Sequence, residues 1–119
     1  MFYIGIEDLA ANAFIEMIKK SANQPKKTYC VTLTELEAYG RKIVQYLEQR
    51  GEKAVLMLSR DNTDAFFRDY SDYFEECEVC GELGISLKYE KKVEDLIHKF
   101  RGYLQLDVLQ AFINVGWNA

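Results

Sequence analysis

Apolar residues near the start of the chain recur with the spacing of a helix. They cover about half of a helical wheel, and Ala11 and Ile15 widen that arc. The members are Ile6, Leu9, Ala10, Ala13, Phe14, Met17 and Ile18. The pattern predicts a helix over residues 8–20 with Asp8 as its N-cap, after a short strand or lead-in over residues 2–6. Because the arc is so wide, we expect this helix to pack on more than one side.

The next segment combines an alternating strand with an amphipathic helix. Residues 28–33 are rich in β-branched side chains, which predicts a strand. Thr34 and Glu37 have the spacing of a capping box, and the helix that they open is expected to end at Gly51. Its apolar positions are Leu36, Tyr39, Ile43 and Leu47.

Residues 54–59 form a nearly continuous apolar run bounded by charged residues. Such a run predicts a central strand covered on both faces, as in a parallel sheet. A helix follows over residues 62–77, capped by Asn62 or Thr63, and an edge strand is expected over residues 85–89. The turn between them is marked by Gly81 and Gly84.

Two further helices are predicted near the end of the chain. The first has one apolar face, and the second begins with Asp107 as its cap and again has a wide apolar arc. The first face consists of Val93, Leu96, Ile97, Phe100 and Leu104. Wide arcs on the first and last helices indicate either a thick helical layer inside one molecule or a contact between copies of the chain.

Strands that alternate with helices favour an α/β or α+β fold. We expect a small, three- to four-stranded, partly parallel sheet flanked by about five helices, with right-handed crossovers. The 119 residues contain no linker-like segment or repeat, so residues 1–119 are expected to form a single globular domain.

Composition narrows the classes of protein to which the chain can belong. It is 49% hydrophobic and 29% charged, which predicts a folded core. The N-terminus lacks the pattern of a secretory signal, and no apolar run approaches the length of a membrane span. An odd number of cysteines, three, fits a reducing compartment. We therefore expect a cytoplasmic protein that does not enter membranes.

Acidic residues are concentrated in the second half of the chain. The formal net charge is −4, and twelve of the nineteen Asp and Glu residues follow Arg60. An acidic chain without a basic stripe repels phosphate backbones, which argues against nucleic-acid binding. A basic protein is the partner that this charge favours.

Residues 61–82 hold eight acidic residues and one basic residue, Arg68, interleaved with aromatic residues. On a helical wheel the aromatic side chains and Cys77 share one arc, and the acidic side chains fill the other. One interpretation is an amphipathic helix whose acidic face meets water, with Arg68 paired to Asp64 and Asp72. However, three glutamates gather near the predicted helix C-terminus, where the helix dipole disfavours anions.

The second interpretation is an acidic docking face for a basic protein partner. A small acidic inhibitor or immunity-type protein that covers the positive groove of a toxin or nuclease would have this pattern. The candidate partner-binding residues are Asp64, Arg68, Asp69, Asp72, Glu75, Glu76 and Glu78.

Cys77 and Cys80 have the Cys-x-x-Cys spacing of dithiol and zinc sites. Neighbouring glutamates at a helix C-terminus would raise the pKa of the Cys77 thiol, which disfavours redox catalysis. A zinc site would also need Cys30 and His98, and His98 is predicted to point to water. We expect incidental thiols, with a Cys77–Cys80 metal site as a weak alternative, and no metal or other cofactor.

An enzyme would place its site at the carboxyl ends of parallel strands. There Glu7, Asp8 and Asp61 could hold Mg²⁺ while Arg60 faces a phosphate. Neighbouring polar residues are Thr32, Thr34, Ser59 and Asn62, which serve equally well as helix caps. No phosphate loop, nucleophile elbow or Ser/His/Asp set is present. The sequence therefore favours a non-catalytic interaction module, with a small carboxylate-dependent, Mg²⁺-using hydrolase or phosphoryl-transfer enzyme and a structural homo-oligomeric subunit as alternatives.

Overall fold

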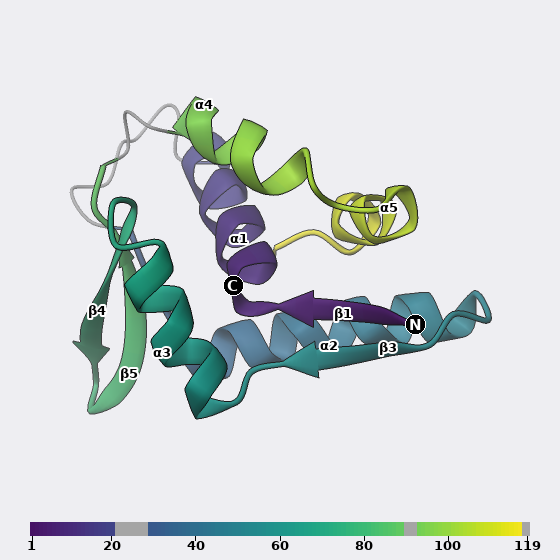
Figure 1. Cartoon of the computed structure of the whole chain (residues 1–119), viewed down its shortest axis with the longest axis horizontal. Coiled ribbons are helices and arrows are strands. Elements are labelled where there is room, and N and C mark those ends of the chain that lie inside the picture. Colours follow the sequence, from purple (N-terminus) through teal and green to yellow (C-terminus); the bar gives the residue numbers. More distant parts are fainter. Residues whose placement is uncertain (21–28, 90–92, 118–119) are drawn as a thin grey trace.

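The computed structural model describes residues 1–20, 29–89 and 93–117 (Figure 1). A helix-rich α+β fold is confirmed. In chain order the elements are β1 (Phe2–Gly5), α1 (Ile6–Lys20), β2 (Cys30–Thr32), α2 (Leu33–Gln49), β3 (Ala54–Met57), α3 (Arg60–Asp69), β4 (Phe74–Val79), β5 (Glu82–Leu87), α4 (Val93–Leu96), the π-helical segment η2 (Ile97–Arg101) and α5 (Leu106–Val115).

The described strands form two small sheets. β1 and β3 pair in parallel, with Phe2 opposite Ala54 and Gly5 opposite Met57. β2, β5 and β4 form an antiparallel sheet in that order. The predicted parallel pairing is therefore found between β1 and β3. The three-stranded sheet is separate from this pair and is antiparallel.

α1 is the central element of the fold, with both sheets and the other helices arranged around it (Figure 1). It is buried on nearly every side along its first ten residues, which explains its wide apolar arc as packing within one molecule. Even the polar Asn12 is fully buried, and it accepts a hydrogen bond from Arg101 Nε at 2.9 Å and donates one to Asp8 O at 2.8 Å. The polar atoms of this side chain are thus satisfied inside the core.

Helix starts differ from the predictions by two to four residues. α1 begins at Ile6, so Asp8 lies in its first turn and is not its N-cap. The capping box of α2 is formed by Thr32 and Glu35, not by Thr34 and Glu37: Glu35 N donates to Thr32 Oγ1 and Thr32 N donates to Glu35 Oε1. α3 is capped by the Ser59 hydroxyl, which accepts from Asn62 N. Thr32 and Ser59 both have extended backbone and short hydroxyl side chains, as N-caps require.

The predicted helix over residues 62–77 is wrong in its second half. α3 ends at Asp69, a turn follows, and β4 pairs with β5 along its whole length. A tight turn at Cys80 and Gly81, both with positive φ, joins these strands. The aromatic residues still face the core, since the ring centroid of Phe66 lies 5.2 Å from that of Phe74 and the ring centroid of Tyr70 lies 5.0 Å from that of Phe100. The same aromatic rings can therefore be buried whether this segment forms one long helix or a helix, a turn and a strand.

Two predicted strand positions are also wrong. β5 is the central strand of its sheet and not an edge. β3 is not central, because its only described neighbour is β1, and Val55 on this strand is exposed.

The C-terminal helices follow the prediction with small shifts. Asp107 lies in the first turn of α5 and does not cap it, because the N-cap position is Gln105. Val108, Ala111 and Phe112 on this helix are buried, whereas Leu106 and Ile113 are exposed. The wide apolar arc of α5 is therefore only partly covered by the described chain.

Candidate functional site

All seven predicted partner-binding residues lie on the surface formed by α3, the following turn and β4, which we call the α3–β4 surface. Asp64, Arg68 and Asp69 lie on α3, and Asp72 lies in the turn. Glu75, Glu76 and Glu78 belong to β4. Each of the seven is exposed.

Arg68 does not pair with Asp64 and Asp72, as the helical wheel predicted. Its Nε lies 3.2 Å from Asp69 Oδ1, and both side chains are well exposed, so the pair contributes little stability. Within the described residues, none of the other carboxylates of the α3–β4 surface has an ion pair. These carboxylates are exposed to solvent.

Strand geometry divides the glutamates between two faces of the antiparallel sheet. Successive residues of a strand point to opposite faces, so Glu76 and Glu78 share the face of buried Phe74, while Glu75 shares the opposite face with Cys77. The helix-dipole argument for these glutamates fails, because they do not lie at a helix end. Their position on an edge strand gives them another role, since charged side chains there discourage pairing with a further strand.

Glu76 and Glu78 line an open hollow of about 430 Å³ at the end of the β4–β5 hairpin. Leu83 and Gly81 contribute to its wall together with Cys77. Leu83 pairs with Glu78 across the hairpin, so an apolar side chain lies beside the carboxylates. The sequence pattern did not reveal this hollow, because it depends on the pairing of β4 with β5.

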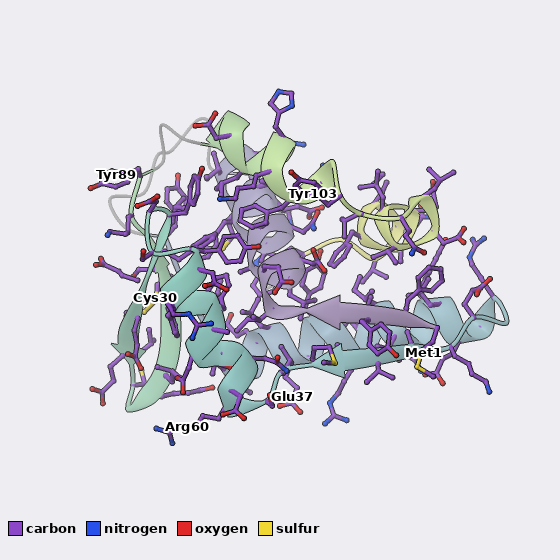
Figure 2. All side chains as sticks on the ribbon, in the orientation of Figure 1. Met1, Cys30, Glu37, Arg60, Tyr89 and Tyr103 are labelled. Carbon is purple, nitrogen blue, oxygen red and sulfur yellow. A yellow bond between two sulfur atoms is a disulfide. The ribbon has the colours of Figure 1, made fainter. Side chains whose placement is uncertain are left out.

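Cys77 and Cys80 do not act as a pair. Cys77 forms a disulfide with Cys30, and Cys80 is a free, exposed thiol at the hairpin turn. The disulfide joins β2 and β4 across the intervening β5, at Gly84 (Cys30 is labelled in Figure 2). A Cβ on Gly84 would lie 3.0 Å from Cys77 Sγ and 3.4 Å from Cys30 Sγ, so this position suits a residue without a side chain.

This pairing corrects the expectation of incidental thiols and removes Cys77 as a metal ligand. It also weakens the argument from cysteine content for a reducing compartment, since structural disulfides are typical of oxidising ones. His98 is exposed, as predicted. The described residues contain no group of three or more His, Cys, Asp or Glu placed to hold a metal ion, so neither the zinc nor the magnesium arrangement is assembled among them.

A second candidate site lies at the carboxyl ends of β1 and β3, whose parallel pairing brings Glu7 and Asn62 to one cavity of about 300 Å³. Its wall includes three residues that the sequence pattern did not place there: Tyr3, Asp69 and Tyr70. Arg60, which was expected to face a phosphate at this site, instead points away from the molecule (Figure 2). Asp8, Ser59 and Asp61 do not line this cavity, and Thr32 and Thr34 belong to the other sheet and the helix that follows it.

Carboxylates make this end of the parallel pair strongly negative. Burial raises the pKa of Tyr70, and the charges of Glu7, Asp8 and Asp69 raise it further. Burial, with a smaller contribution from Glu7, raises the pKa of Asp8 to about 7, although Gly5 N donates a weak hydrogen bond to its Oδ2 at 3.4 Å. Asp8 lines a neighbouring cavity of about 220 Å³ with Tyr3 and Tyr103.

Comparisons with protein families, curated proteins and solved structures found no match. Across the described residues, no helix has both the length and the apolar character that crossing a membrane requires. The functional argument therefore rests on the geometry and charge of the two candidate sites.

Proposed function

We propose that this chain is a non-catalytic interaction module that binds a basic protein through the α3–β4 surface. The observation that carries the proposal is the hollow at the β4–β5 hairpin, where Glu76 and Glu78 stand about 7 Å apart on one face of a strand. An arginine or lysine of the partner can lay its aliphatic stem on Leu83 and place its cation between the two carboxylates.

The remaining acidic residues extend this hollow into a larger negative field. Asp64 and Asp72 have no ion pair within the described chain, and the formal net charge of −4 adds to the attraction. Such a field accelerates the approach of a positive partner and weakens with added salt. An inhibitor that covers the positive groove of a nuclease or toxin is the role that this charge pattern favours.

The test compares two variants with the same change in net charge. E76K/E78K reverses the charges of the hollow, and E48K/E52K reverses two exposed glutamates, one at the C-terminal end of α2 and one in the loop that follows it. The probe is a fluorescent decalysine peptide, followed by anisotropy at several salt concentrations. We expect E76K/E78K to weaken binding by about tenfold or more and E48K/E52K to change it by about twofold.

Equal losses in the two variants would show that only net charge matters, and the hollow would have no role. The single variant E75K separates the two faces of β4, since Glu75 lies opposite the hollow. We expect E75K to weaken binding less than the single variants E76K and E78K do. A basic protein captured from cell extract by the wild-type chain, released by salt and not captured by E76K/E78K would identify the partner.

A carboxylate-dependent enzyme is a second candidate function, favoured by one observation. Asp8 lies beside a cavity, and its pKa of about 7 suits a general acid or base at neutral pH. The test is hydrolysis of p-nitrophenyl phosphate and p-nitrophenyl acetate by the wild-type chain and by D8N, with and without Mg²⁺. Turnover that D8N abolishes would support an enzyme, and turnover that D8N retains would exclude Asp8 from catalysis.

A further inference from the structure

The two-stranded parallel sheet has one covered face and one open face. Alternation along β1 and β3 places Phe2, Ile4, Ala54 and Leu56 on the covered face, where Ile4 is fully buried. The other face, which we call the open face, consists of Met1, Tyr3, Gly5, Lys53, Val55 and Met57. Lys53 belongs to it because Phe2 N donates to Lys53 O at 2.8 Å, which extends the ladder by one residue.

Apolar side chains of the open face are in contact with water. Tyr3 is 64% exposed and Val55 is 40% exposed. α2 lies behind β1 and β3, and no described element lies in front of them (Figure 1). Parallel sheets are almost always covered on both faces, so a bare face on such a pair indicates that another surface covers it.

The exposed apolar area continues beyond the two strands. Tyr3 and Met1 share a cavity with Tyr103, which is 85% exposed. Leu106, which is 77% exposed, begins the helix that follows this segment. The loop between η2 and α5 therefore enlarges the open face at the side of β1.

Opposite charges stand at the two ends of the open face. Lys53 is exposed at the amino end, level with Met1. The carboxylate of Glu7 lies at the carboxyl end, because a Cβ built on Gly5, which would point out of the open face, meets Glu7 Oε1 at 2.6 Å. These ends are about four residues apart, or roughly 13 Å along the strands.

We propose that the open face binds a second copy of this chain in a two-fold symmetric dimer. In that arrangement the strands of the two copies run in opposite directions, Tyr3 and Val55 meet their counterparts at the centre, and Lys53 of each copy reaches the cavity that holds Glu7 of the other. The dimer therefore contains two Lys53–Glu7 contacts, one at each end of the interface, as two-fold symmetry requires. The cavity of about 300 Å³ beside Glu7 has room for the lysine side chain.

The interface is small, because each side of the strand pair presents only three residues to the open face. Even with Tyr103 and Leu106, the area is at the lower end of specific protein interfaces, and we expect dissociation in the micromolar range. Sedimentation equilibrium from about 1 to 300 micromolar should therefore show a monomer that becomes a dimer, and a monomer throughout this range overturns the proposal.

Exchanging the charges of Lys53 and Glu7 tests how the two copies are oriented in the dimer. K53E and E7K each place like charges at both contacts, so each variant alone should be a monomer at concentrations where the wild-type chain is a dimer. An equimolar mixture of the two variants restores both pairs, and we expect a heterodimer of one copy of each. A mixture that stays monomeric overturns the proposal, as does a dimer that neither variant weakens.

A further pair of variants separates the open face from the exposed side of α5. Y3E should abolish the dimer, whereas I113E, which changes a 56% exposed residue on α5, should leave it unchanged. The opposite result would assign the contact to α5 and reject the open face. Circular dichroism of each variant checks that it is folded, since Tyr3, Lys53 and Ile113 are exposed and Glu7 is half-buried. None of these variants alters the glutamates of the hollow, so the outcome is independent of the proposed function.

Discussion

At the scale of single residues, the raised pKa of Asp8 makes stability depend on pH. Its folded-state pKa of about 7 lies above the ordinary value for aspartate, so the folded chain binds the proton more tightly than the unfolded chain. The stability associated with this proton is fully present below about pH 4 and is lost as pH rises towards 7, because the unfolded state then gains by ionising.

The variant D8N stays neutral and should remove this pH dependence. We expect it to raise the free energy of unfolding by about 1–3 kcal/mol at pH 8 and to leave it nearly unchanged near pH 4, measured by urea denaturation. D72N, at an exposed turn position, serves as the control and should show no such difference. If D8N and wild type have the same free energy of unfolding at pH 8, the Asp8 carboxylate is solvated in the folded chain and the prediction is wrong.

At the scale of elements, the start of α2 depends on Thr32 and not on Thr34. Thr32 Oγ1 accepts from Glu35 N at 3.1 Å, whereas Thr34 is exposed and its backbone N–H donates to Glu82 Oε1. We expect T32A to lower the free energy of unfolding by about 1 kcal/mol and T34A to change it by less than about 0.5 kcal/mol. Parallel chemical denaturation of the two variants measures this difference, and similar losses would contradict the assigned cap.

Whether a segment forms a helix or a strand was predictable wherever its apolar residues follow a single periodicity. Residues 8–20 and 36–47 bury residues at helical spacing, and both are helices, with bounds that shift by a few residues. Between Tyr70 and Val79 the aromatic residues fit a helical wheel, yet the chain forms a turn and a strand. The deciding interaction is non-local, since β4 gains its backbone hydrogen bonds from β5. Cys80-Gly81 was the local signal for that hairpin, because a tight turn favours residues that accept positive φ.

At the scale of the whole molecule, the sequence indicated the mixture of helices and strands but not the division into two sheets. Strand patterns show which residues are apolar, and they do not show which strands pair. The same limit applies to the candidate sites. Exposure of the acidic residues followed from their charge, whereas the hollow beside Glu76 and the cavity beside Glu7 depend on strand pairing.

The disulfide between Cys30 and Cys77 connects the two outer strands of the antiparallel sheet and closes a loop that contains α2, β3 and α3. The two cysteines have a sequence separation of 47, so the cross-link removes chain entropy from the unfolded state, and its stabilisation is about 4 kcal/mol by loop length. We therefore expect C30A/C77A to unfold at a lower denaturant concentration than wild type, with a loss of about 2–4 kcal/mol.

The control for this prediction is C80S, because Cys80 is exposed and unbonded, and its stability should match that of wild type. Alkylation of the denatured chain before reduction should label one thiol, and alkylation after reduction should label all three. If three thiols react before reduction, the two cysteines are not joined in the protein as purified. If the reduced and oxidised chains unfold at the same denaturant concentration, the cross-link does not hold the outer strands together, and the hydrogen bonds of β5 alone maintain the sheet.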